Sequence, residues 1–181
     1  MTRLACWNRD MDEVEIVNYD PRWAVLFDEE AKRLRAVLDP SLILGLEHFG
    51  STAVPGLSAK PIIDILIAVR SLADAQAIFI EALRNLDYVH WADNPKKDRM
   101  FFVKGMPPFG SRRSHHVHVT EPHGEMWQRL AFRDYLRAHP EEAGTYARLK
   151  RRFAAEHQGD REAYTDAKSA YIESVMRKAI K

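Results

Sequence analysis

The chain has 181 residues, of which 46% are hydrophobic, and this composition indicates a folded domain with a sizeable core rather than disorder. Lys and Arg number 27 against 26 for Asp and Glu, so the net charge of +1 gives no general reason to expect nucleic acid or membrane binding. The charge is uneven only locally, since six basic residues and one acid lie between Lys96 and Arg113, a run typical of a solvated loop.

The one cysteine, Cys6, excludes an internal disulfide and fits a reducing compartment. The N-terminal stretch MTRLACWNRDMDEVE lacks the apolar core of a signal peptide. No apolar run approaches the about 20 residues that a membrane helix needs. We therefore expect a soluble, cytoplasmic protein, whose oligomeric state the sequence does not indicate.

The predicted elements begin with a short strand at 14–19 and a helix that has Asp20 as its N-cap and Pro21 at its first position. Helical spacing places four apolar residues and one acid on a single face of this helix: Trp23, Phe27, Glu30, Leu34 and Val37. Strands are predicted next at 42–49 and 61–69. A second helix follows at 71–86, with Ser71 as N-cap and Asp74 three residues on.

Three further strands are predicted at 87–91, 100–105 and 111–121. After Gly124 the chain reads as helical in three segments, of which the first ends near Ala138, the second begins at Pro140 and the last begins at Asp160 as a cap. This order predicts one α+β domain over 1–181, with a mixed sheet flanked by helices at about 13–122 and a helical extension at about 124–179.

The predicted strand PIIDILIAV carries a lone acid, Asp64, in a strand that is apolar on both faces and therefore expected to be central. Alternation puts Asp64 on one face with Leu66. A buried carboxylate is costly unless it is paired or bound to a metal ion. Asp64 is expected either at the mouth of a cleft or in a buried ion pair with an arginine or with Lys60.

The segment SHHVHV places His116 and His118 on one face of a strand, where two imidazoles can reach the same point. Two histidines and a carboxylate suit zinc, iron or manganese. The alternative is a solvated strand face. The metal interpretation requires the histidine strand to lie next to the strand of Asp64.

The segment GSTAVPG offers a glycine that allows close backbone approach, Gly50, and two hydroxyls, Ser51 and Thr52. Backbone N–H groups in such a loop can bind anions. The alternative is an ordinary turn with a local Ser or Thr hydrogen bond.

These segments, EHFGSTAVPGLSAKPIIDILIAV, RMFFVKG and HHVHV, together with the C-terminal LAFRDYLRAHPEEAGTYARLKRRFA and YTDAKSAYIESVM, resemble the GrpB-like (UPF0157-type) family. The resemblance runs from about Val14 to Met176, and the family is also found fused to dephospho-CoA kinase. The family is similar to the DNA polymerase beta-like nucleotidyltransferases, which implies that fold for this chain.

In that superfamily a Gly-Ser turn holds the triphosphate, while an Asp-X-Asp pair and a third carboxylate hold two magnesium ions. The pair Gly50-Ser51 and the acid Asp64 match this pattern. Leu66 stands at the second acid position, and histidines stand where the third carboxylate is expected. The departure matters because magnesium prefers oxygen ligands.

The resemblance thus predicts a protein of nucleotidyltransferase fold that binds a nucleotide or another small phosphate ligand. The reaction that the resemblance implies is metal-dependent nucleotidyl transfer. The alternatives are a non-catalytic module that binds a nucleotide or a protein, and a His/Asp metal-dependent hydrolase. The candidate catalytic residue is Asp64. The candidate ligands of a divalent ion (Mg, Mn or Zn) are Asp64, His116 and His118. The candidate phosphate-binding residues are Gly50, Ser51, Thr52, Lys60, Arg99 and Lys104.

Lys168 shares a helical face with Tyr164, Tyr171 and Val175. Core packing along the lysine stem is expected there. The alternative is that Lys168 folds back over the cleft.

Overall fold

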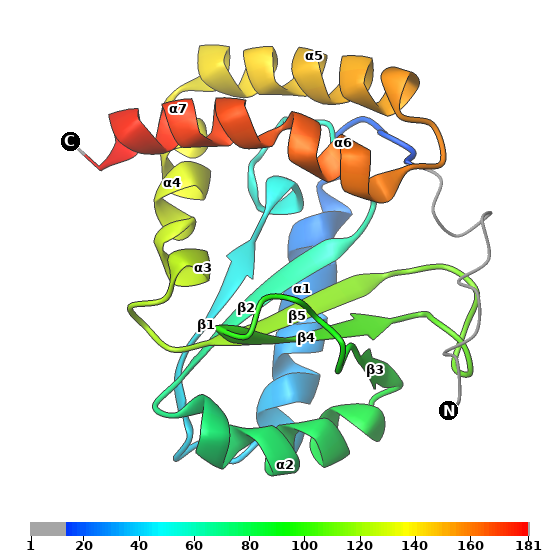
Figure 1. Cartoon of the computed structure of the whole chain (residues 1–181), viewed down its shortest axis with the longest axis vertical. Coiled ribbons are helices and arrows are strands. Elements are labelled where there is room, and N and C mark those ends of the chain that lie inside the picture. The colour runs from blue at the N-terminus through cyan, green and yellow to red at the C-terminus, as the bar shows by residue number, and fades with distance from the viewer. Residues whose placement is uncertain (1–13, 181) are drawn as a thin grey trace.

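The structure is a computed structural model that describes residues 14–180; Cys6 and the N-terminal stretch before Val14 lie outside the described residues. At its centre is a five-stranded mixed sheet with helices on both sides (Figure 1). The strand order is β1-β2-β5-β4-β3, and only β2 and β5 run parallel. The strands are β1 (Ile43–Phe49), β2 (Ile63–Val69), β3 (Tyr88–His90), β4 (Arg99–Lys104) and β5 (His115–Thr120).

One face of the sheet is covered by α1 (Arg22–Val37) and α2 (Leu72–Arg84). The main core lies between these helices and the sheet, where Leu34 and Phe79 contact the alternate β2 residues Ile65 and Ile67. Because β2 lies between β1 and β5 and is buried on both faces except at Asp64, the expected central strand is confirmed.

The C-terminal helices form a second layer that packs on the loop after β1 rather than on the main core. They are α3 (Glu125–Gln128), α4 (Leu130–Ala138), α5 (Pro140–Glu156), α6 (Arg161–Ala167) and α7 (Ser169–Ala179). Their apolar cluster joins Leu136 and Val175 to Val54 and Leu57 of that loop. Figure 1 shows α5, α6 and α7 together beyond one end of the sheet, with α3 and α4 running along its side.

The predicted α+β architecture is confirmed, and so are several local features. The side chain of Ser71 accepts a hydrogen bond from the Asp74 N–H at the start of α2, and that of Asp160 accepts from Ala163 at the start of α6. Among the described residues no helix is both apolar enough and long enough to cross a lipid bilayer.

Three local predictions differ from the structure. The predicted strand at 14–19 forms only an isolated bridge between Val17 and Ala59, because no neighbouring strand extends the pairing. The first helix begins at Arg22 rather than at Pro21. Val37, expected on the buried face, is 39% exposed at the last turn of that helix.

The predicted C-terminal segments also need refinement. The second coincides with α5, but the first is interrupted at Arg129 and the last at Lys168. Each interruption places a cation at a bend, and both cations line the pocket described below.

Candidate functional site

The sheet brings Asp64 and the two histidines together on one face. The parallel pairing of β2 with β5 sets Asp64 opposite His116 and Leu66 opposite His118. In-register residues of neighbouring strands point to the same side. The expected adjacency of the two strands is therefore confirmed, and ligand atoms of Asp64, His116 and His118 lie within 4.8 Å of one another.

The Asp64 carboxylate is bonded to an imidazole rather than to an arginine or lysine. Its Oδ1 lies 3.0 Å from His116 Nδ1, and within the described residues no Arg or Lys reaches it as an ion pair. Burial raises the pKa of Asp64, but the hydrogen bond from His116 and the nearby groups of His118 and Lys60 outweigh burial and lower that pKa. Asp64 is therefore ionised at neutral pH.

Both histidines are held neutral with one ring nitrogen unused. Burial lowers the pKa of His116, and it lowers that of His118 to about 3. His116 Nε2 and His118 Nδ1 are buried and have no hydrogen-bond partner among the described residues. Neutral imidazoles with a free nitrogen next to a carboxylate fit a divalent metal ion. Zinc-type bond lengths of about 2.1 Å require donor atoms closer together than 4.8 Å, so the three side chains would have to approach one another to hold such an ion.

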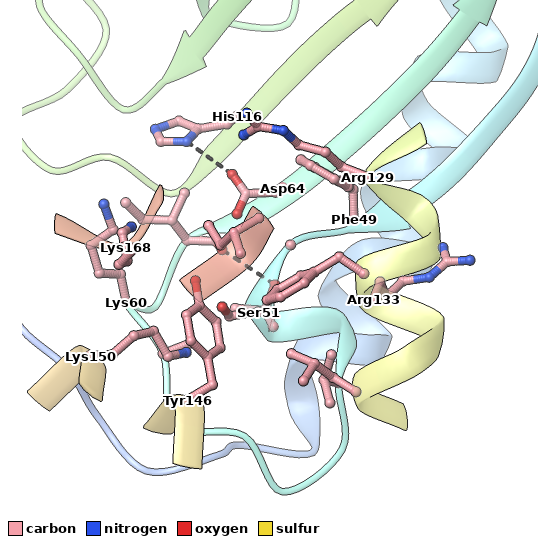
Figure 2. Close-up of a pocket in the computed structure, with 18 of the residues that line it drawn as sticks. Phe49, Ser51, Lys60, Asp64, His116, Arg129, Arg133, Tyr146, Lys150 and Lys168 are labelled. Carbon is pink, nitrogen blue, oxygen red and sulfur yellow. Dashed lines mark hydrogen bonds and ion pairs between the residues drawn. The ribbon is translucent and has the colours of Figure 1, made fainter. Parts of the chain in front are cut away.

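The glycine of the Gly-Ser turn is required by the carboxylate itself. Gly50 has φ 71°, and a Cβ at this position would lie 2.5 Å from Asp64 Oδ2. Only glycine fits both the backbone conformation and the contact. The turn thus sits directly against the candidate metal ligand, with Ser51 at its exposed side in the pocket (Figure 2).

Thr52 of the same turn is engaged within the fold. Its hydroxyl donates to the Ile62 carbonyl at 3.4 Å and lies 3.1 Å from His48 Nε2. Burial lowers the pKa of His48 to about 4, so His48 is neutral and donates to Thr52. Although Thr52 borders the pocket, its hydroxyl fixes the turn in place. The Ser51 hydroxyl lies in the pocket beside the Tyr146 hydroxyl, with which it forms a side-chain hydrogen bond.

A pocket of about 180 Å³ opens beside the turn and the carboxylate. Its sheet side is formed by Gly50, Ser51, Asp64 and His116, and its other side by the C-terminal helices. Figure 2 shows Lys60, Lys150 and Lys168 gathered on one side of this space, with Asp64 and His116 above them.

Sequence reasoning placed Lys60 here but missed Lys150 and Tyr146 of α5. Lys150 is 2% exposed, and its ammonium donates to the Ser58 carbonyl. The sequence signal for Lys150 was weak, because a lysine in a helix is normally exposed. Lys168, expected to pack in the core, lies 3.9 Å from the Tyr164 ring centre and also lines the pocket.

Two expected phosphate-binding cations lie outside the pocket lining. Lys104 points to the opposite face of the sheet, where its ammonium lies 2.7 Å from Glu30 Oε1. The reason is alternation: Lys104 pairs in register with His115, which faces away from His116. The expectation for Lys104 is thus corrected. Arg99 is on the same face of the sheet as His116 and His118. Counted from His116, it lies farther along β4 than Phe101, which pairs with His118, and its side chain is 8% exposed.

Two arginines of the helical layer border the pocket but already have partners. Arg129 donates to Glu125. Arg133 donates to Glu47, Asp134 and the His48 carbonyl, and its guanidinium points away from the pocket in Figure 2.

Comparison with known proteins finds similar chains in several bacteria. A profile described as GrpB protein matches residues 13–178. A UPF0157 protein of Pseudomonas aeruginosa is 47% identical over 96% of this chain and 70% of its own length. A protein named dephospho-CoA kinase from Mycolicibacterium paratuberculosis is 30% identical over 92% of this chain, which spans 46% of that protein. The crystal structure of conserved protein GrpB from Enterococcus faecalis superposes with a TM-score of 0.81 at 34% identity, over 92% of this chain and 97% of that one.

Proposed function

Because this chain belongs to the GrpB family, we propose that it binds a nucleotide or another phosphorylated small molecule beside a divalent metal ion, as a metal-dependent transferase of nucleotidyltransferase-like fold. One observation carries the proposal: Asp64 and His116, which form a cluster with His118, line a pocket that Lys60, Lys150 and Lys168 also line. A metal ion and cations on opposite sides of one space are what a phosphate group requires.

The position of His118 supports this use of the fold. Leu66 stands where the resemblance places a second acid, and it is fully buried. His118 is the register neighbour of Leu66 on β5, so its imidazole lies beside the place that a second carboxylate would occupy. In this proposal His118 would supply a third ligand near the expected place, of nitrogen rather than oxygen chemistry, which favours zinc or manganese over magnesium.

The residues of the chain have separate roles in this proposal. Asp64, His116 and His118 would hold the ion, which would neutralise charge developing on the phosphate. Ser51 and Lys60 would bind phosphate oxygens. Gly50 keeps the turn close to Asp64, so that one phosphate could contact Ser51 of the turn and the metal ion at Asp64 together.

A second candidate function is metal-assisted hydrolysis of a phosphate ester. The two unpaired imidazole nitrogens favour it, because histidine-rich sites are typical of zinc-dependent hydrolysis. The two reactions differ in their products. Nucleotidyl transfer from a nucleoside triphosphate releases pyrophosphate only when an acceptor is present, whereas hydrolysis needs water alone.

The proposal is tested by melting curves of EDTA-treated protein with ATP and with Zn²⁺, Mn²⁺ or Mg²⁺, singly and together. We expect ATP with a divalent ion to raise the Tm of the wild type. The double variant Ser51→Ala, Lys60→Ala should lose most of this shift, since it removes one hydroxyl and one cation that line the pocket.

A matched control is the double variant Ser41→Ala, Lys32→Ala, which changes the same residue types at exposed positions away from the pocket. It should respond like the wild type. Equal Tm shifts in all three proteins would contradict binding at this site. Binding of ATP and metal without any product would identify a non-catalytic module instead.

A further inference from the structure

The pocket is distinguished by three lysines that come from three separate parts of the chain. Lys60 precedes β2, Lys150 lies in α5, and Lys168 lies between α6 and α7. Aromatic rings support all three ammonium groups: Lys60 and Lys168 lie 5.2 and 3.9 Å from the Tyr164 ring centre, and Lys150 lies 4.8 Å from that of Tyr146. Figure 2 shows the three lysines approaching the same space.

These ammonium groups have no carboxylate partner. Within the described part of the chain, none of the three forms an ion pair, and Asp64 is the acid that borders the pocket. Three positive charges thus face one negative charge, an excess of two when all the lysines are protonated. The other charged groups that act on them are also cationic: Arg113, Arg129, Arg151 and Arg161.

Burial and mutual repulsion make this excess costly in the free protein. Burial, together with the neighbouring cations, lowers the pKa of Lys60 to about 7, that of Lys150 to about 6 and that of Lys168 to about 8. Asp64 raises each of these pKa values but does not restore them. An anion placed among the lysines would favour their charged forms.

The size of the pocket limits what part of a ligand it can enclose. Pockets that surround a drug-sized ligand measure about 300–1,000 Å³, whereas this one measures about 180 Å³. A whole nucleotide would therefore extend out of it. A terminal phosphate fits better than an internal one, because a phosphodiester must leave the pocket on two sides.

We propose that the lysine cluster, defined as Lys60, Lys150 and Lys168, binds the terminal phosphate of a phosphomonoester as a dianion, and that binding draws protons onto these lysines. The inference rests on the proposed phosphate-binding function and names the ligand class. A dianion balances the excess of two charges, whereas a diester carries one charge and leaves half of the excess uncompensated.

The experiment is isothermal titration calorimetry of EDTA-treated protein with methyl phosphate and with dimethyl phosphate, in two buffers that differ in ionisation enthalpy. Methyl phosphate should bind at least tenfold more tightly than dimethyl phosphate. At pH 8 the heats in the two buffers should differ in the direction of proton uptake, because some lysines are neutral before binding. Affinity should fall as the pH rises from 8 to 10, while the phosphate remains dianionic.

Lysine variants test whether methyl phosphate binding and proton uptake depend on the lysine cluster. Lys168→Gln should weaken methyl phosphate binding about tenfold and reduce proton uptake, and Lys60→Gln provides an independent second variant. Lys32→Gln, exposed on α1, is the matched control and should bind as the wild type does.

The two levels of the proposal fail in different ways. Equal affinity for the monoester and the diester without proton uptake would overturn the dianion proposal and leave phosphate binding intact. If neither probe binds, and ATP with metal produces no Tm shift, both the dianion proposal and the proposed function are wrong.

Discussion

The two faces of the sheet both hold partly or fully buried charges, but they differ in how those charges are balanced. Beneath α1, Glu30 is 2% exposed and its carboxylate bonds to Lys104 at 2.7 Å and to the Tyr88 hydroxyl at 3.1 Å. Burial raises the pKa of Glu30, but Lys104, together with His115 and Tyr88, outweighs burial and lowers that pKa. This charge has its counter-charge within the fold.

The pocket face has the opposite arrangement. Its three lysines face the single carboxylate of Asp64, which is itself bonded to a neutral imidazole. Buried charge on the first face is therefore compensated within the fold, whereas on the pocket face it is retained at a cost to the fold. Burial alone therefore does not identify a functional charge. A buried charge that lacks a counter-charge within the fold is the one that indicates a ligand site.

The largest effect should come from breaking the balanced pair. Lys104→Met keeps the bulk of the side chain but leaves the Glu30 carboxylate buried with weaker partners. We expect a loss of about 3–5 kcal/mol in the free energy of unfolding, measured by urea denaturation at pH 7. Metal and phosphate binding in the folded fraction should not change, since Lys104 lies across the sheet from the pocket.

The control for Lys104→Met is Arg22→Met, which removes an ion pair of similar length, 2.6 Å to Asp20, whose arginine side chain is 82% exposed. An exposed pair contributes little to stability, because water and salt screen it. If the two variants lose the same stability, the Glu30 pair is not the stabilising network described here.

A smaller loss of stability is expected for Asp64→Asn, with a large loss of metal binding. The asparagine oxygen can still accept from His116, so only the difference between a charged and a neutral hydrogen bond is lost, about 1 kcal/mol. Zn²⁺ and Mn²⁺ titrations of the folded variant should show affinity reduced by a factor of ten or more.

Asp93→Asn, in the exposed loop before β4, is the matched control for Asp64→Asn and should leave both quantities unchanged. A loss of several kcal/mol in apo Asp64→Asn with metal affinity intact would show that Asp64 serves the fold instead of a ligand.

The smallest effect, of opposite sign, is expected for Lys168→Met. The pKa of Lys168 falls from 10.5 to about 8 on folding, so between these values the unfolded chain binds more protons and the stability of the wild type rises with pH. Stability from this lysine is thus lost as the pH falls through 8. At pH 7 the variant should be more stable than the wild type by about 0.5 kcal/mol.

Urea denaturation at pH 7 and at pH 9.5 measures this sign directly. The stability gain of Lys168→Met should shrink at the higher pH, and Lys32→Met should show no such trend. A loss of stability at pH 7 would mean that Lys168 is a balanced core residue like Lys104.

The sequence by itself determined most of the helices and strands, and which side chains share a face of each strand. Local rules suffice for these, because a cap such as Ser71 acts within one helical turn and side chains alternate along any strand. The same rules separated Asp64 from its apolar neighbours and set His116 and His118 on one side. They also isolated Gly50 and Ser51 as a turn next to a carboxylate.

Only the tertiary structure decided which of these faces meet. The parallel pairing of β2 with β5 depends on hydrogen bonds between distant segments, and the order of strands in a sheet is not written in any one of them. That register joined Asp64 to His116, and the pairing of β4 with β5 placed Lys104 on the opposite face beside Glu30. The lysines of the pocket were hidden for the same reason: Lys150 and Lys168 belong to helices whose packing on the loop after β1 turns them inward, and packing between remote surfaces leaves no local pattern.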